Sequence, residues 1–218
     1  MTRISITSLK ASSPRRLTAL ALLAAPAAHA GTAIVAGGCF WCVESDFESV
    51  PGVGDVVTGF TGGTTADPTY RSHGDHIEAA TIPFDEGEIG YRRILDLFFR
   101  SIDPLDANGQ FCDRGHAYST AVFVDGPEQR RIAEAAKADA EAELGRQIVT
   151  PILEAGAFYP VGDYHQDYYK SDDRIAISSL GIGVPKSEAY LRYREGCGRD
   201  ARVREVWGDD APFVKHGS

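Results

Sequence analysis

Apolar residues recur along the chain with two different spacings, and each spacing predicts a different kind of element. Short apolar and β-branched runs are typical of strands, whereas apolar residues three and four positions apart are typical of helices that bury one face. Proline and glycine close several of these segments, as Pro51-Gly52 does after the first helical pattern. The expected elements are strands at 32–36, 53–60, 76–84, 119–124 and 148–154, and helices at 40–50, 89–102 and 127–145.

This order of elements predicts an α+β fold in which two helices cover one face of a mixed sheet. The fold class is a two-layer sandwich that is ferredoxin-like in arrangement. No internal repeat, linker or low-complexity tract interrupts residues 31–218, so we expect a single domain there. Residues 178–218 are rich in glycine, arginine and other charged residues, which predicts a long, irregular surface tail pinned by Tyr190, Tyr193 and Trp207.

The first thirty residues have the pattern of a secretory signal peptide. They contain four basic residues and no acidic one, then an apolar run at 17–25 and the small-x-small sequence Ala28-His29-Ala30. The apolar run is too short to span a bilayer, so we expect cleavage after Ala30 and export to the periplasm. General secretion fits better than twin-arginine export, although Arg15-Arg16 leaves the second route open.

Acidic residues outnumber basic ones, at 31 Asp and Glu against 22 Lys and Arg, which gives a net charge of −9. All four basic residues of the signal segment are lost on cleavage, and the acidic excess of the remaining chain is then larger still. An acidic surface without a basic patch is a poor match for nucleic acid or for an anionic membrane. We therefore expect neither as a partner.

The chemistry of the chain centres on the sequence Gly-Gly-Cys-Phe-Trp-Cys-Val-Glu at 37–44. Cys39 falls where the first strand meets the first helix, and two glycines precede it, so the backbone can turn sharply there. A cysteine at a helix N-terminus faces unpaired N–H groups and the positive end of the helix dipole, which both favour a thiolate. Phe40 and Trp41 add apolar surface, so the segment predicts an activated thiolate beside an apolar pocket.

Two structural alternatives apply to the same cysteines. Cys39 and Cys42 could belong to a disulfide framework of the four cysteines in an exported chain, or they could be zinc ligands. The glycines and the two large aromatic residues argue against a zinc knuckle. His116 and His165 could join Cys112 in a metal site, but their spacing fits no standard one, and we expect no metal or organic cofactor.

The motif around Cys39 resembles the signature of the A-type peptide methionine sulfoxide reductases. Further segments match this family in the same order, namely Gly-Phe-Thr-Gly-Gly at 59–63, Pro-Thr-Tyr at 68–70, His-Ile-Glu at 76–78, Asp113 with Tyr118, and Tyr-His-Gln-Asp-Tyr at 164–168. The resemblance extends over roughly residues 32–170. It implies the two-layer α+β fold and the stereospecific reduction of methionine S-sulfoxide, free or in proteins.

The resemblance also implies roles for individual residues. Cys39 would be the nucleophile, and Glu78 would be the acid that protonates the sulfoxide oxygen. The residues alone favour a carboxylate at a strand edge facing water for Glu78, and the resemblance reverses this in favour of a buried carboxyl, whose pKa burial would raise. The substrate-binding residues would be Phe40 and Trp41 for the methyl group, Tyr70 and Tyr118 for the oxygen, and Asp113 in the pocket wall.

A second cysteine must then resolve the sulfenic acid left on Cys39. Cys197 ranks first, because flanking glycines give it mobility and nearby arginines favour its thiolate. Cys42 ranks second, since its place in a helical face suits burial better than exchange. Cys112 ranks third, because the neighbouring carboxylate of Asp113 disfavours its thiolate.

A thioredoxin-like protein is the expected reductant, a monomer is the expected state, and repair of oxidised exported proteins is the expected role. Two other classes remain open at this point. A thioredoxin-type thiol–disulfide oxidoreductase would use Cys39 and Cys42 as its redox pair, and a disulfide-stapled binding module would use the cysteines only for stability. Neither class predicts stereoselective reduction of methionine sulfoxide.

Overall fold

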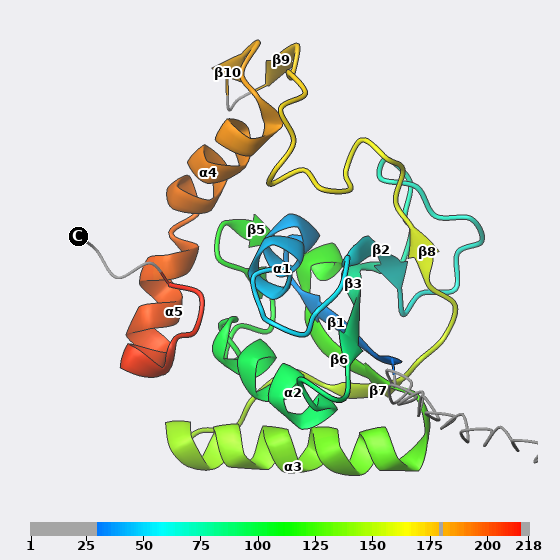
Figure 1. Ribbon diagram of the computed structural model, residues 1–218, viewed down its shortest axis with the longest axis vertical. Coiled ribbons are helices and arrows are strands. Elements are labelled where there is room, and N and C mark those ends of the chain that lie inside the picture. The colour runs from blue at the N-terminus through cyan, green and yellow to red at the C-terminus, as the bar shows by residue number, and fades with distance from the viewer. Residues whose placement is uncertain (1–29, 179–180, 215–218) are drawn as a thin grey trace, which may run out of the picture.

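The computed structural model describes residues 30–178 and 181–214, and it centres on a six-stranded mixed sheet (Figure 1). The sheet contains β1 (Ala30–Gly37), β2 (Val57–Thr61), β3 (Ile77–Asp85), β6 (Thr120–Val124), β7 (Ile152–Glu154) and β8 (Tyr159–Pro160). Their spatial order is β7-β6-β1-β3-β2-β8. Only β6 and β7 pair in parallel, and the other neighbouring pairs of this sheet are antiparallel.

Helices cover one face of this sheet. They are α1 (Phe40–Phe47), α2 (Tyr91–Arg100) and α3 (Gly126–Leu144). Alternate residues of β1 lie on opposite faces of the sheet. Ala33 and Val35 belong to the core under the helices, whereas Ala36 belongs to a smaller apolar cluster on the other face. Apolar residues of α2, among them Phe98 and Phe99, are fully buried in the main core. The expected two-layer α+β arrangement is therefore confirmed, with α1 as a third helix in the helical layer.

The expected elements occur in the expected chain order with somewhat different ends, and the sixth strand of the sheet, β8, was not expected. The second strand begins at Val57 instead of residue 53, because Val53 forms only an isolated bridge with Phe84. The strand expected at 148–154 is limited to Ile152–Glu154, which follows Pro151. Two short pairs of strands, β4 (Gly109–Gln110) with β5 (Asp113–Arg114) and β9 (Ile177–Ser178) with β10 (Gly181–Ile182), were not expected.

The C-terminal part is more regular than its composition predicts. It contains α4 (Lys186–Gly196), α5 (Arg199–Trp207) and the 3₁₀ turn η2 (Gly208–Asp210), and the two helices stand beside the sheet and its helical layer (Figure 1). Charged residues that indicated an irregular tail instead form ion pairs one turn apart, such as Glu188 with Arg192. Tyr190 and Trp207 are buried, as expected for residues that pin this segment.

The expected signal peptide falls almost entirely on residues 1–29, which lie outside the described residues. Ala30, after which cleavage is expected, is the first residue of β1 and pairs with Asp85. Within the described residues, no helix is both long enough and apolar enough to cross a membrane.

Candidate active site around Cys39

Cys39 lies at the junction of β1 and α1, where it is the residue that caps the N-terminus of the helix. The turn depends on Gly38, whose φ of 79° falls in the left-handed region that favours glycine. A Cβ atom at Gly38 would lie 2.5 Å from Cβ of Gln110, so a larger residue would also collide with the neighbouring segment. The strand-to-helix corner expected from the sequence is therefore present, and the Cys39 side chain is buried beneath it.

A cavity of about 50 Å³ opens beside Cys39. One water molecule needs about 10–15 Å³ on this measure, so the cavity has room for a small group such as the end of a side chain. Its lining contains every residue expected to act as nucleophile, as acid or in substrate binding. The lining residues are Cys39, Phe40, Trp41, Tyr70, Glu78, Asp113, Tyr118 and Tyr193.

Glu78 is the buried acid of this cavity. It is the second residue of β3, its side chain is almost fully buried, and its Oε2 accepts a hydrogen bond from the backbone N–H of Phe40 at 3.0 Å. Burial is the main cause that raises the pKa of Glu78 to about 8, and the Phe40 hydrogen bond opposes the rise. The carboxyl is therefore mostly protonated near pH 7, and the alternative of a carboxylate facing water at a strand edge is wrong.

Hydroxyl groups and a second carboxyl form the polar wall of the cavity. Tyr118 ends the 3₁₀ turn η1 (His116–Tyr118), and burial raises its pKa to about 12, so it keeps its proton and can donate it in a hydrogen bond. Burial also raises the pKa of Tyr70 and of Asp113. The Tyr193 hydroxyl donates a hydrogen bond to Oδ2 of Asp113.

Tyr193 is a lining residue whose place in the site could not be read from the sequence. It was expected only to pin the C-terminal tail, and no local motif marks it. It lies on α4, 80 residues after Asp113, and it reaches the cavity because α4 packs against the segment that carries Asp113. A tyrosine in an expected surface tail gives no signal from which this contact could be found.

Aromatic rings form the apolar wall. The indole of Trp41 stacks on the ring of Tyr168, with centroids 3.9 Å apart, and Phe40 packs edge-on against Phe60 at 5.9 Å. These contacts hold both side chains at the cavity, as expected of residues that enclose a methyl group. His165 stacks on Tyr70 with centroids 3.9 Å apart, so it supports the rim of the cavity.

The charge state of Cys39 differs from the sequence-based expectation of an activated thiolate. Burial raises the pKa of the Cys39 thiol, and the neighbouring Cys42 raises it further. The pKa of Cys42 is instead lowered, first by a hydrogen bond with Cys39 and then by Arg199 and Arg194. Burial therefore outweighs the effect of the helix N-terminus on the Cys39 thiol.

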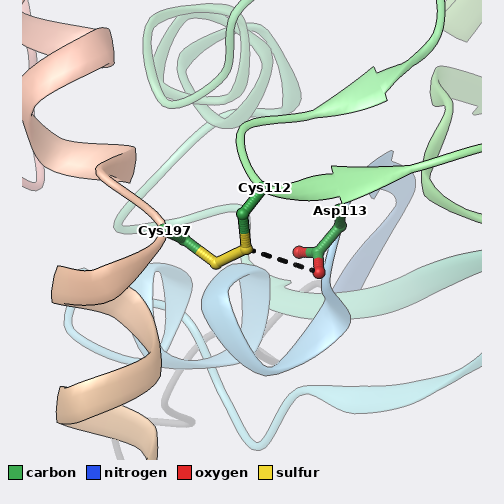
Figure 2. A group of neighbouring side chains, drawn as sticks. All are labelled: Cys112, Asp113 and Cys197. Atoms are coloured by element: carbon green, nitrogen blue, oxygen red, sulfur yellow. Dashed lines mark hydrogen bonds between the residues drawn. A yellow bond between two sulfur atoms is a disulfide. The ribbon is translucent and has the colours of Figure 1, made fainter.

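The other two cysteines form a disulfide (Figure 2). Cys112 bonds to Cys197, which follows α4, and Asp113 lies beside the two sulfurs. Cys112 is exposed and Cys197 half-buried, whereas Cys39 and Cys42 are buried and free. Cys42 thus lies next to the expected nucleophile, and Cys197, the first-ranked resolving cysteine, is paired with the third-ranked one.

The histidines considered as metal ligands do not gather around Cys112. His116 bonds through Nε2 to the backbone oxygen of Asp75, and His165 lies in the aromatic wall. Two groups of close ligand atoms occur in the described part of the chain. They are Cys112, Asp113 and Cys197, whose sulfurs are in the disulfide, and Glu44, Glu48 and Asp167, where Lys170 pairs with Glu48 and Asp167.

A buried cysteine, a protonated carboxyl and tyrosine hydroxyls around a small cavity with one aromatic wall define a thiol-dependent oxidoreductase site. Residues 31–194 match the family model described as peptide methionine sulfoxide reductase. The peptide methionine sulfoxide reductase MsrA 2 of Rhizobium meliloti is 45% identical over 197 residues, which cover 89% of this chain and 92% of that protein. The chain belongs to the peptide methionine sulfoxide reductase family, and it is an enzyme of this class.

Solved structures agree with this assignment. Methionine sulfoxide reductase A of Corynebacterium diphtheriae superposes with a TM-score of 0.57 at 27% identity, covering 72% of this chain and 83% of that one. Mxr1 from Saccharomyces cerevisiae in its reduced form gives a TM-score of 0.61 at 25% identity, covering 66% and 86%. The family and fold expected from the sequence are therefore confirmed.

Proposed function

We propose that this enzyme reduces the S epimer of methionine sulfoxide, free or in proteins, at the cavity beside Cys39. The observation that carries the proposal is that a cysteine and a protonated carboxyl, Glu78, line one small cavity with an aromatic wall. The cavity is small, and it combines aromatic rings with hydroxyl and carboxyl groups. A fixed apolar wall opposite fixed oxygen donors can accept only one configuration at sulfur.

In the chemical step, the sulfur of Cys39 attacks the sulfoxide sulfur while Glu78 protonates the oxygen. Tyr70 and Tyr118 donate hydrogen bonds to that oxygen, and Phe40 and Trp41 enclose the methyl group. Methionine leaves, and the oxygen remains on Cys39 as a sulfenic acid. We expect no metal or organic cofactor in this sequence of steps.

We revise the ranking of resolving cysteines and place Cys42 first. Its hydrogen bond with Cys39 supports direct condensation with the sulfenic acid, which forms a disulfide and releases water. Cys197 and Cys112 then act as a second pair. Because Cys112 is exposed while Cys39 is buried, the second pair is the better contact for a thioredoxin-like reductant.

We further propose that the protein is exported, that a signal peptide is removed after Ala30, and that the mature enzyme is a monomer that repairs oxidised exported proteins. The basic and apolar pattern of residues 1–30 supports export. The acidic net charge supports an enzyme that does not bind nucleic acid. Export can be tested by fractionating cells and determining the N-terminal residue of the mature protein.

The assay for the proposed activity uses separated S and R epimers of methionine sulfoxide with dithiothreitol as reductant. We expect methionine from the S epimer alone. Equal reduction of both epimers would contradict the site, and reduction of neither would contradict the proposed function. A dithiol substitutes for the protein reductant, so this result does not depend on which partner acts in the cell.

A further inference from the structure

The Cys112–Cys197 disulfide joins two parts of the chain that both line the cavity (Figure 2). Cys112 lies in the turn between β4 and β5, and Cys197 is the first residue after α4. Asp113 directly follows Cys112. Tyr193 lies one helical turn before Cys197, whose backbone N–H donates a hydrogen bond to the Tyr193 oxygen at 2.9 Å. The disulfide therefore connects the two segments that bring Asp113 and Tyr193 to the cavity.

A non-covalent link lies beside the disulfide. The Tyr193 hydroxyl donates a hydrogen bond to Oδ2 of Asp113, and the Tyr193 ring packs edge-on against Trp41 with centroids 6.1 Å apart. Tyr193 therefore connects the polar wall of the cavity to its aromatic wall. This connection depends on how the end of α4 is held against the segment that carries Asp113.

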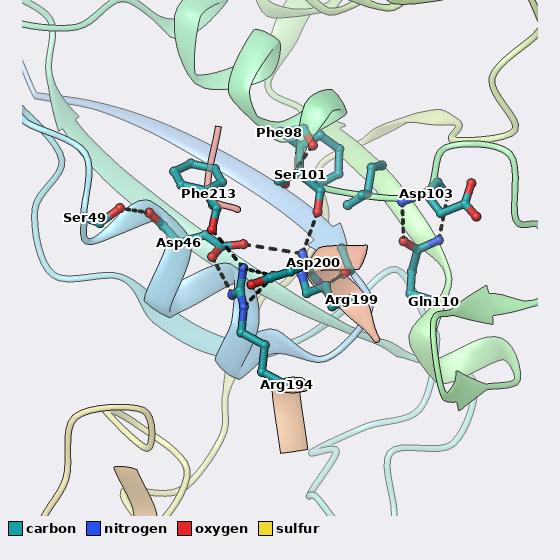
Figure 3. Close-up of polar contacts among 12 residues, drawn as sticks. Asp46, Ser49, Phe98, Ser101, Asp103, Gln110, Arg194, Arg199, Asp200 and Phe213 are labelled. Atoms are coloured by element: carbon teal, nitrogen blue, oxygen red, sulfur yellow. Dashed lines mark hydrogen bonds and ion pairs between the residues drawn. The ribbon is translucent and has the colours of Figure 1, made fainter. Parts of the chain in front are cut away.

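The elements on either side of the disulfide have anchors of their own (Figure 3). On α4, Arg194 pairs with buried Asp46 of α1 at 2.6 Å, and Tyr190 is buried. On β4, the side-chain amide of Gln110 accepts a hydrogen bond from the backbone N–H of Asp103 at 2.9 Å and donates one to its backbone oxygen at 2.8 Å. Opening the disulfide should therefore leave α4 and β4 in place.

The tip of the β4–β5 hairpin is less firmly held. The two strands have two residues each, and Cys112 at the tip is exposed. The guanidinium of Arg199 on α5 lies over the Phe111 ring, 4.7 Å from its centroid. Such a contact permits small shifts, whereas the disulfide keeps the two cysteine Cα atoms 4.8 Å apart. The disulfide is therefore the contact that fixes Asp113 relative to Tyr193.

We propose that the Cys112–Cys197 disulfide is a clasp that positions Asp113 and Tyr193 in the wall of the substrate cavity, so that the enzyme binds methionine sulfoxide more tightly with this bond closed than open. The inference rests on the proposed function and gives the second cysteine pair a positioning role. A dithiol opens the clasp when it reduces the bond to two thiols and is itself oxidised to a disulfide. Two electrons and two protons pass to the cysteines in this exchange, and Cys112 is exposed to such a reductant.

Opening the clasp should affect binding more than the chemical step. The wall loosens where Asp113 and Tyr193 meet. Cys39 and Glu78 are held by other elements, since Cys39 lies at the corner of β1 and α1, and Glu78 of β3 accepts the hydrogen bond from Phe40. The concentration of substrate that half-saturates the enzyme should therefore rise, while the limiting rate changes little.

The test is the rate of the first turnover at a series of concentrations of methionine S-sulfoxide. The closed enzyme is prepared without reductant and must show the two free thiols of Cys39 and Cys42. The open enzyme is the same protein reduced with dithiothreitol, which is then removed. We expect the half-saturating concentration to rise about tenfold on opening, the usual effect of losing one hydrogen-bonded contact, with the limiting rate within about threefold.

Two variants show whether the clasp acts through Tyr193. Cys112→Ser with Cys197→Ser should behave like the open parent, which alone gives the comparison if this variant fails to fold. Tyr193→Phe keeps the ring and removes the hydrogen-bond donor, so it should weaken binding by the closed enzyme. It should add less than about twofold to the double serine variant, because both changes break the same link. Tyr169→Phe, whose lost hydroxyl bonds to Glu48 outside the cavity, is the matched control.

The same half-saturating concentration in the closed and open enzymes would overturn this inference and leave the proposed function intact. An equally large effect of Tyr193→Phe in the parent and in the double serine variant would also overturn it, because the disulfide would then act independently of Tyr193. A loss of stability without a change in binding is the result of a purely structural disulfide, and it too would overturn the inference. A parent that releases no methionine in either form would instead overturn the proposed function.

Discussion

Replacing the buried acid by its amide, Glu78→Gln, should remove activity and change the pH dependence of stability. The amide cannot protonate the sulfoxide oxygen, so the first turnover should slow by ~10²–10⁴-fold. Its oxygen can still accept the hydrogen bond that Phe40 donates to Glu78. The variant should therefore keep the architecture of the cavity.

The effect on stability follows from the raised pKa of Glu78. Because each pKa unit corresponds to about 1.4 kcal/mol, a rise from 4.5 to about 8 costs the folded state about 5 kcal/mol once the carboxyl is ionised. The stabilising contribution of the protonated Glu78 carboxyl is therefore fully present below pH 4.5. It is lost as the pH rises from there through about 8. Glutamine does not titrate, so the free energy of unfolding of the variant relative to the parent should rise by roughly 3–4 kcal/mol between pH 5 and pH 8.

The assay is urea unfolding of parent and variant at pH 5 and pH 8, with exposed Glu86→Gln as the matched control. Any effect of the amide on the free energy of unfolding that does not depend on pH cancels when the two pH values are compared. An equal pH dependence in parent and Glu78→Gln would refute the buried, protonated acid. A first-turnover rate within tenfold of the parent would refute its catalytic role.

Three other variants test separate parts of the site. Cys39→Ser should abolish turnover with an unchanged circular dichroism spectrum, because an alcohol is far less acidic than a thiol. Activity within tenfold of the parent would mean that another residue is the nucleophile. Gly38→Ala should destabilise the protein by ~1–3 kcal/mol in urea, since it forces a φ of 79° on a residue with a Cβ; an unchanged midpoint would contradict the strained corner. Cys112→Ser with Cys197→Ser should lower stability by ~2–4 kcal/mol relative to the oxidised parent, and no loss would mean that the disulfide does not form.

Much of the sheet and its helices could be predicted because their signals are local. The run at 32–36 lies within the buried central strand β1, and the apolar spacing at 89–102 is that of α2. The corner at Cys39 was also recognisable, because Gly38 is required by a positive φ and the helix follows at once. Where a segment has strong periodicity and ends at glycine or proline, its own residues determine its secondary structure.

Features that depend on remote contacts could not be predicted in this way. Tyr193 joins the cavity only because α4 packs beside the Asp113 segment, and the Cys112–Cys197 bond spans 85 residues. The charge state of Cys39 was misjudged for a related reason. The helix N-terminus is a local signal, whereas burial and the arginines behind Cys42 come from α4 and α5.

The most direct test of the central claim is to mix the reduced enzyme with one equivalent of methionine S-sulfoxide and no other reductant. Methionine is then quantified, free thiols are alkylated, and the oxidised cysteines are mapped by mass spectrometry. We predict one methionine per enzyme molecule and a new bond that contains Cys39, first with Cys42. Methionine formation without any oxidation of Cys39 at the earliest time point would contradict the account.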